Sequence, residues 1–284
     1  MELYQMYNPI TATPFAHNEH YMEFEPCLEL KPFIKCFWGT NKPIQLKKTD
    51  IETTGIVTPD TCMDIIFEAD FTNNKISDSF CGINTHTFET YSKNDTEKEI
   101  FTFAIRFYAW SVVCFSEESM QNVLNEAFDA GYHFEKIKKR MLPLLFQARN
   151  MEEMKSMAEG ILLSNLNEKH GNRLVLEAVF QMMKKKGNIQ MEQLAKEIHT
   201  SNRQLERLFK TYVGISPKGM ASLIRYQYLW NDILYCPDFQ IFDAVCKYGY
   251  TDQAHLFHDF KKYHSMNIKE AKEYAVKHVA FLQE

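Results

Sequence analysis

Charged and amide side chains gather on one side of a short segment near the C-terminus. Its apolar residues have the spacing of one buried helix face, namely Leu205, Leu208, Phe209 and Tyr212. The opposite face carries Asn202, Arg203, Glu206, Arg207 and Lys210. A guanidinium group matches both a phosphate and the edge of guanine through paired hydrogen bonds, so Arg207 is the main candidate for such a contact. The pattern predicts nucleic-acid binding, with an ordinary solvated helix face as the alternative.

The neighbouring polar residues are expected to have different roles. Ser201 and Gln204 fit a capping box, in which the Ser201 hydroxyl accepts from the backbone of Gln204 and the Gln204 side chain reaches back. We expect Asn202 and Gln204 to cap the helix or to contact phosphate rather than to read bases. Glu206 could accept a hydrogen bond from the amino group of cytosine, or it could weaken binding to DNA of other sequences. The residues leave both roles open.

The elements around this segment predict how it is positioned. A short helix precedes it, with an apolar stripe at Met191, Leu194, Ala195 and Ile198. Two short helices joined by so tight a turn have the layout of a helix-turn-helix. Beyond them, Gly214 suits a helix end, Ser216 an N-cap and Pro217 a first turn. The helix that follows has roughly 18 residues, so it spans about 27 Å before Pro237 stops it.

The same arrangement returns beyond this long helix. Gly249 and Tyr250 form a predicted turn, and Thr251 or Asp252 caps a last polar helix that runs to about His264. The residues of this helix that we expect to face DNA are Gln253, Ala254, His255, His258, Lys261 and Lys262. A plain surface position is the alternative for the two histidines. The run Lys184–Lys186 is expected to be a solvated helix end.

Three motifs resemble the signature of the AraC/XylS-type transcription regulators. They are Ser201-x-Arg-x-Leu-x-Arg-x-Phe-Lys210, then Gly214-Ile-Ser-Pro217, then Gly249-Tyr-x-Asp-Gln-x-His-x-x-x-x-Phe-Lys261. The resemblance covers about residues 188–274 and implies two helix-turn-helix units joined by one long helix. Their recognition helices would enter successive major grooves, which lie about 34 Å apart on one side of the duplex.

The second unit departs from the family pattern at several positions. Asp259 stands where the family usually has an apolar residue, and Phe257 where it has a small or polar one. After Lys262 the usual glycine, Thr-Pro pair and tyrosine are replaced by Ser265, Asn267, Ile268 and Ala271. These departures predict looser packing and a less certain base readout in the second unit.

The first 171 residues have a different sequence pattern, with short segments rich in β-branched and aromatic residues from about Tyr21 to Trp110. Strands are predicted at Cys62–Phe67 and Ile100–Phe107, with Asp70–Ser79 as a polar loop, and the preceding segment Ile34–Trp38 is left unassigned. Later segments predict helices, which are expected to start at Ser116 and to cover Phe134–Gln147, Met151–Asn167 and Arg173–Lys185. The predicted fold class is therefore α+β, with a small antiparallel barrel or sandwich followed by an all-helical part.

Two segments of this first part resemble the barrel-type N-terminal domain of a subgroup of the same regulators. The segments are Thr58-Pro-Asp-x-Cys-Met-Asp-Ile-Ile-Phe67 and Ala104-Ile-Arg-Phe107. The subgroup usually continues with a Pro-Gly pair, whereas Tyr108-Ala-Trp follows here. The resemblance implies a sensing or dimerisation domain and names no effector.

Charge supports a division at Gly171. Residues 172–284 hold 16 Lys and Arg against 12 Asp and Glu, while residues 1–171 hold 16 against 25. Only the C-terminal part is therefore expected to face a polyanion. We expect a domain 1–171 for sensing or dimerisation and a DNA-binding domain 172–284.

Several other classes of protein are disfavoured by the sequence. The seven cysteines are scattered without a CxxC pair, which predicts free thiols and no disulfide framework or zinc site. Cys62 could sense oxidants, although a buried structural thiol is the plainer interpretation. A metal-binding barrel would need paired histidines, which His17, His20 and His86 do not form. No nucleophile elbow, P-loop or dinucleotide fingerprint is present, so we expect no enzyme and no cofactor.

The N-terminal residues show neither a signal peptide nor an apolar run of the roughly 18 residues that would span a membrane. The sequence thus predicts a cytoplasmic protein with double-stranded operator DNA as its partner, no membrane contact, a homodimeric state and RNA polymerase as a candidate partner. Aromatic residues of the strands could line a pocket for a small apolar effector, with core packing as the equal alternative. They are Phe67, Phe103, Phe107 and Trp110.

The function predicted is that of a sequence-specific transcription regulator whose N-terminal part responds to an effector or a partner. One alternative is an apolar small-molecule binding protein whose DNA contacts have become secondary. Another is a dimerising architectural regulator with no ligand. Stabilisation of residues 1–171 by a ligand would separate these two, because a ligand that binds only the folded state raises its melting temperature.

Overall fold

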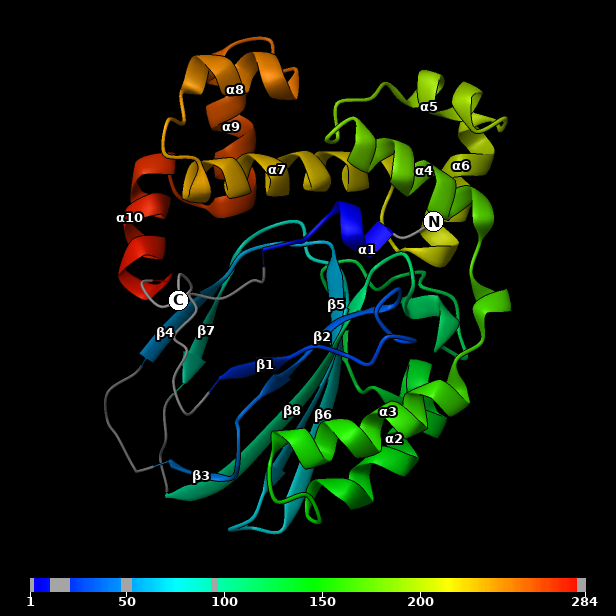
Figure 1. The fold of residues 1–284 in the computed structure, drawn as a ribbon, viewed down its shortest axis with the longest axis vertical. Coiled ribbons are helices and arrows are strands. Elements are labelled where there is room, and N and C mark those ends of the chain that lie inside the picture. The colour runs from blue at the N-terminus through cyan, green and yellow to red at the C-terminus, as the bar shows by residue number, and fades with distance from the viewer. Residues whose placement is uncertain (1–2, 11–20, 47–52, 93–96, 280–284) are drawn as a thin grey trace.

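The computed structural model describes residues 3–10, 21–46, 53–92 and 97–279. Its first half is built on antiparallel strands and its second half is helical (Figure 1). A short helix, α1 (Leu3–Met6), comes first. The strands that follow are β1 (Met22–Phe24), β2 (Ile34–Gly39), β3 (Ile44–Leu46), β4 (Thr53–Val57), β5 (Cys62–Asp70), β6 (Lys75–Cys81), β7 (Phe88–Ser92), β8 (Lys98–Tyr108) and β9 (Ala127–Phe128). This architecture confirms the predicted α+β class.

Seven of these strands form one sheet, and β4 and β7 form a second. The main sheet has the order β1-β2-β8-β5-β6-β9, with β3 paired to one end of β8. The two sheets do not close on each other, so the sandwich is confirmed rather than the barrel. At the centre, β5 pairs over its whole length with β8, which places Asp64 directly opposite Arg106.

The predicted polar loop at Asp70–Ser79 is wrong, because most of it is the hairpin between β5 and β6. A turn closes this hairpin, where the Asp70 carboxylate accepts from the backbone of Asn73. Most of β6 is exposed or half-buried. A strand with so little buried surface needs few apolar residues, so its sequence lacks the alternation that marks a strand.

The two faces of the main sheet have different neighbours. Met63, Ile65 and Phe67 alternate along β5 on the face that α2 (Gly131–Leu145) and α3 (Met151–Asn165) cover. There the Phe134 ring of α2 lies 4.9 Å from Phe80 between ring centroids. Cys62, Asp64 and Ile66 point to the opposite face, toward β4 and β7.

The helix expected to start at Ser116 is absent from that part of the described chain. Residues 112–114 form one 3-10 turn instead, and irregular chain follows as far as β9. The Ser116 hydroxyl contacts Nδ1 of His133 and donates to the carbonyl of Glu118, so it closes a local turn and caps no helix. Segments rich in Ser and Glu suit either role.

Seven helices complete the described chain. They are α4 (Arg173–Lys184), α5 (Met191–Glu197), α6 (Asn202–Tyr212), α7 (Pro217–Tyr235), α8 (Ile241–Tyr248), α9 (Gln253–His264) and α10 (Ile268–Val279). Helix α7 runs across the top of the strands, with α5 and α6 near one end and α8 and α9 near the other (Figure 1). Ser216 caps α7 as predicted, and of the two candidates for α9 it is Asp252 that accepts from the helix backbone. None of the described helices is both long and apolar enough to cross a membrane.

Candidate functional site

Helix α6 exposes the charged face that its sequence predicts. Asn202, Arg203, Glu206, Arg207 and Lys210 are exposed, whereas Leu205, Leu208 and Phe209 are buried. Ser201 is exposed at the N-cap, and its hydroxyl accepts from the backbone N–H of Gln204 at 3.2 Å. The other half of the expected capping box is replaced, because the half-buried Gln204 side chain accepts from Nη2 of Arg207 at 2.8 Å. Gln204 therefore orients the guanidinium of Arg207.

Helix α9 exposes most of its expected DNA-facing residues. Gln253, Ala254, His258, Lys261 and Lys262 are exposed. His255 is half-buried, since its Nδ1 lies 3.1 Å from the Thr251 hydroxyl and its ring meets Tyr250 edge-on at 5.2 Å. Phe257 is also exposed. The basic groups of α9 thus cluster in its last turn and at His258.

The unusual Asp259 of α9 has a partner on the long helix. Its carboxylate accepts from Nη2 of Arg225 on α7 at 2.7 Å and from the Tyr250 hydroxyl at 3.2 Å. The Arg225 guanidinium also lies over the Tyr250 ring, 4.4 Å from its centroid. These contacts fix α9 to α7 at the position where the family pattern predicts looser packing, because a paired carboxylate can replace an apolar contact.

Helices α6 and α9 are both held at their C-terminal ends by the first half of the chain. The backbone N–H of Met120 donates to the carbonyl of Thr211, in the last turn of α6, at 2.8 Å. The Thr87 hydroxyl donates to the carbonyl of Tyr263, in the last turn of α9. The last carbonyls of a helix have no partner within the helix, so these two donors satisfy groups that α6 and α9 leave free.

The first half also reaches the middle of α7. The buried Gln227 side chain donates from Nε2 to the carbonyl of Pro59 and accepts at Oε1 from the backbone of Ile10, both at 2.8 Å. The Tyr7 and Tyr228 rings pack 5.3 Å apart beside it. Because Gln227 uses both ends of its amide across the interface, it ties two separate N-terminal segments to one turn of α7.

A cavity of about 440 Å³ lies between the two sheets. Trp38, Val57, Ile66 and Phe88 supply apolar walls, and Asp60, Asp64 and Arg106 supply charge. The volume is within the range of roughly 300–1,000 Å³ that small-molecule sites usually have. Pro59 lines this cavity, and so does Gly82, whose lack of a side chain allows it to pack against the backbone of Val123.

The charged groups of this cavity form a buried cluster. Asp64 binds Arg106 through two hydrogen bonds, of 2.9 Å to Nε and 3.0 Å to Nη2, and also accepts from the indole N–H of Trp38 at 2.7 Å. Asp60 accepts from the backbone of Cys62 at 2.7 Å, and its Oδ2 lies 3.5 Å from Nη1 of Arg106. Within the described residues, Asp60 Oδ2 and Arg106 Nη1 are buried without a hydrogen bond. Burial raises the pKa of Asp60 to about 6, against the opposing effect of Arg106.

The aromatic residues expected to line an effector pocket lie elsewhere. Phe67, Phe103 and Phe107 are fully buried on the opposite face of the sheet, under α2, and the cavity between the sheets is lined by other residues. Trp110 lines a separate cavity of about 400 Å³ beside Arg173. Core packing is therefore the role of the three phenylalanines, because alternate residues of a strand point to opposite faces.

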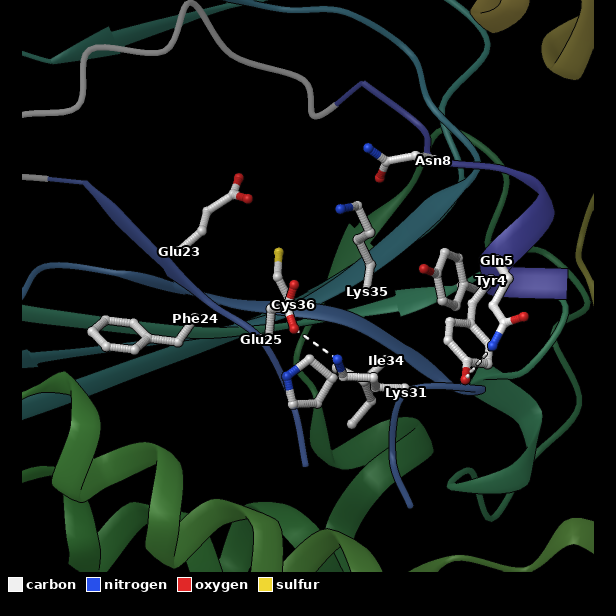
Figure 2. Close-up of a pocket in the computed structure, with 12 residues that line it drawn as sticks. Tyr4, Gln5, Asn8, Glu23, Phe24, Glu25, Lys31, Ile34, Lys35 and Cys36 are labelled. Carbon is white, nitrogen blue, oxygen red and sulfur yellow. Dashed lines mark hydrogen bonds and ion pairs between the residues drawn. The ribbon is translucent and has the colours of Figure 1, made fainter. Parts of the chain in front are cut away.

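Another cavity, of about 450 Å³, lies between α1 and the first two strands (Figure 2). Lys35, Asn8 and Glu23 point toward one open space there, while Lys31 is bound to Glu25 at 2.7 Å (Figure 2). Since cations and carboxylates line the same space, its charge favours no single class of ligand.

The alternatives that involve cysteine or a metal gain no support. Burial raises the pKa of the Cys62 thiol well above its ordinary value, with the nearby Asp60 carboxylate as a smaller cause, so Cys62 stays a protonated thiol. His86 is exposed, and His17 and His20 lie outside the described residues. No cluster that could hold a metal ion occurs in the part of the chain that the structure describes.

Sequence reasoning missed the charged cluster of the cavity and the polar contacts between distant segments. Asp64 and Arg106 could have been found from the sequence, because each is a charged residue within a strand of otherwise buried residues. Gln227 and Arg225 carried a weaker signal, as polar residues on a helix that is otherwise largely buried. Thr87 and Met120 carried none, since their contacts depend on backbone groups that lie far away in the sequence.

Two family models match different parts of the chain. Residues 194–273 match a family model described as a helix-turn-helix domain, and residues 22–129 match one described as a domain of unknown function (DUF6597). No curated protein matches the chain.

Solved structures similar to the chain include ToxT from Vibrio cholerae, with 14% identity and a TM-score of 0.40 over 84% of this chain and 97% of that one. ToxT from Vibrio cholerae O395 has 13% identity and a TM-score of 0.36 over 84% and 98% of the two chains. The unsaturated fatty acid bound ToxT has 13% identity and a TM-score of 0.35 over 91% and 96%. At such values the interpretation of each site rests on the residues of this chain.

Proposed function

We propose that this chain is a transcription regulator of the AraC/XylS type, which binds operator DNA sequence-specifically through α6 and α9 under the control of its N-terminal half. The helix-turn-helix match covers α6 to α9 and ends within α10. The observation that carries the proposal is the pair of exposed polar helices, α6 and α9, packed near opposite ends of one 19-residue helix. A helix of this length spans about 28 Å, which suits two grooves about 34 Å apart.

The contacts within this interface follow from the chemistry of each side chain. Arg207, oriented by Gln204, suits a guanine edge or a phosphate, and Lys210 and Arg203 suit phosphates. Ser201 and Asn202, at the start of α6, suit contacts to the sugar-phosphate backbone of DNA. In the second unit His258, Lys261 and Lys262 are the exposed groups for the neighbouring groove. Glu206 keeps its two roles, as a cytosine contact or as a group that acts against wrong sequences.

We expect the full chain to bind duplex DNA with an affinity that falls steeply with salt. Basic side chains that neutralise several phosphates release counterions, so the affinity should drop about a thousandfold or more between about 50 and 200 mM salt. Fluorescence anisotropy on a duplex selected from a random library measures this. Lys139→Ala, which removes an exposed cation from α2, is the matched control and should leave the salt dependence unchanged. Binding that is absent, or flat with salt, would contradict the proposed function.

Control by the N-terminal half is supported by the segments that border the cavity. Pro59 both lines the cavity and accepts from Gln227 of α7. Phe88 lines it next to Thr87, which holds α9. Gly82 lines it and packs on Val123, in the segment that holds α6. A molecule in the cavity would therefore contact the segments at Pro59 and Phe88, which hold α7 and α9, and Gly82, which packs on the segment that holds α6.

Gln227→Leu should loosen this connection without touching the DNA-facing surface. The change leaves the buried backbone groups of Pro59 and Ile10 unpaired, which costs about 1–3 kcal/mol for each group. We expect calorimetry to show two unfolding transitions in place of one, and operator affinity to change although Gln227 is buried away from DNA. The exposed Gln193→Leu on α5 is the control. A single unshifted transition with unchanged affinity would show that this contact does not connect the halves.

Assembly and location complete the proposal. We infer a homodimer formed through α2 and α3, because their outer surfaces carry the exposed apolar side chains of Tyr132 and Leu163. Such a dimer would act on operator DNA in the cytoplasm, with RNA polymerase as a further partner.

The cavity also favours a second candidate function, that of a small-molecule binding protein with secondary DNA contacts. Weak DNA binding that is unselective for sequence would support that candidate.

A further inference from the structure

The cavity between the two sheets contains one carboxylate more than it has cations. Asp64 and Arg106 neutralise each other through two hydrogen bonds, and the indole of Trp38 fills the remaining position on Asp64 Oδ1. Asp60 is only 7% exposed, and its Oδ2 reaches Arg106 at 3.5 Å, beyond a good hydrogen bond. With all three groups ionised, the cluster carries one net negative charge, centred on Asp60.

Such a carboxylate is costly to bury, which indicates that it has a ligand. Asp60 Oδ2 is buried without a hydrogen bond from any described residue, and Asp60 lines the cavity. Burial raises the pKa of Asp60 to about 6, so at neutral pH the carboxyl remains mostly charged. An uncompensated buried charge is retained mainly where a partner binds to it.

The walls around this charge suit an apolar body. Trp38, Phe88 and Tyr21 bring aromatic rings to the cavity, and Val57 and Ile66 bring aliphatic surface. The Tyr21 and Trp38 rings lie 5.6 Å apart. Aromatic faces attract cations as well as apolar groups, so the walls and Asp60 favour the same kind of molecule.

We propose that this cavity binds a small organic amine, whose protonated nitrogen donates to Asp60 Oδ2 while its apolar body packs against Trp38 and Phe88. This inference rests on the proposed function, because it names the effector class for the N-terminal half. The ammonium restores neutrality to the cluster and supplies the missing donor. A carboxylic acid of the same shape would place a second uncompensated negative charge beside Asp60, and an alcohol would supply a donor without the charge.

The test uses three probes with one body and different head groups, namely 4-phenylbutylamine, 4-phenylbutanol and 4-phenylbutyrate. Each is titrated into the full chain without DNA, by calorimetry and by the shift in melting temperature. We expect the amine to bind about tenfold or more tightly than the alcohol, as a hydrogen bond to a charged group requires, and the acid not to bind. Equal affinities, tighter binding of the acid, or no binding of any probe at millimolar concentration would overturn the inference.

Two variants test whether the amine binds at Asp60. Asp60→Asn keeps the size of the side chain and the acceptor for the Cys62 backbone, but removes the charge. It should reduce amine affinity about tenfold or more and leave alcohol affinity nearly unchanged. Glu68→Gln makes the same charge change at an exposed position on the same face of β5 and should alter neither. An unchanged amine affinity in Asp60→Asn, with the fold intact, would show that the amine binds elsewhere.

The probe titrations and the DNA titrations can fail separately. If the chain binds DNA with the expected salt dependence but prefers the acid, the proposed function stands and the amine class is wrong. If the chain binds the amine through Asp60 but no DNA, the ligand class stands and the proposed function is wrong.

Discussion

Asp64→Ala should lower the free energy of unfolding by about 3–5 kcal/mol, because Arg106 loses two charge-assisted hydrogen bonds and keeps only Asp60, which lies 3.5 Å away. Arg106 is 6% exposed and sits in the central strand β8, so its guanidinium has little access to water as a substitute partner. The loss also frees the Trp38 indole N–H. Urea unfolding followed by circular dichroism measures the change.

Two further variants show whether the charge is the cause. Asp60→Asn removes the uncompensated carboxylate of the same cluster and should leave stability unchanged or increased. The triple variant Asp60→Asn with Asp64→Leu and Arg106→Met removes all three charges at once and should recover most of the stability that Asp64→Ala loses. If Asp64→Ala costs less than about 1 kcal/mol, a typical single hydrogen bond, the cluster is open to solvent rather than buried.

Arg207→Ala should weaken binding to the selected operator by about 1–3 kcal/mol and remove the base preference at one position. Lys210→Ala should instead weaken all sequences about equally and reduce the slope of log affinity against log salt by about one, because a phosphate contact carries no sequence information. Anisotropy titrations on operator variants at several salt concentrations separate the two patterns.

The controls for Arg207→Ala come from the same helix and from α9. Leu208→Ala lies on the buried stripe of α6, so its loss of binding should accompany loss of stability. His258→Ala probes the second groove, since His258 is exposed whereas His255 is engaged with Thr251. If Arg207→Ala and Lys210→Ala both stay folded and bind as well as the parent, α6 is misassigned. A loss confined to His258→Ala would then move the readout to α9.

Local patterns in the sequence determined the helical half. Apolar stripes, caps and the glycines at 214 and 249 predicted α5 to α9 with ends close to those observed, because each signal acts over a single turn. Both glycines have positive φ, of 81° and 67°, in keeping with their predicted places at a helix end and a turn. The exposed faces of α6 and α9 followed from the same period, apart from the half-buried His255.

Tertiary structure alone decided the contacts between distant segments. A strand pattern cannot say which of its two faces meets helices and which meets another sheet. The sequence therefore left Phe67, Phe103 and Phe107 open between a pocket and the core, whereas Asp60, Asp64 and Arg106 line the cavity. The pairing of Asp259 with Arg225, and the donors that Thr87 and Met120 offer to α9 and α6, depend on chain segments that are close only after folding. Hydrogen bonds and ion pairs of this kind have no local period. The sequence therefore predicted the helices α6 and α9 and their exposed polar faces, and the fold decided how they are connected to the cavity.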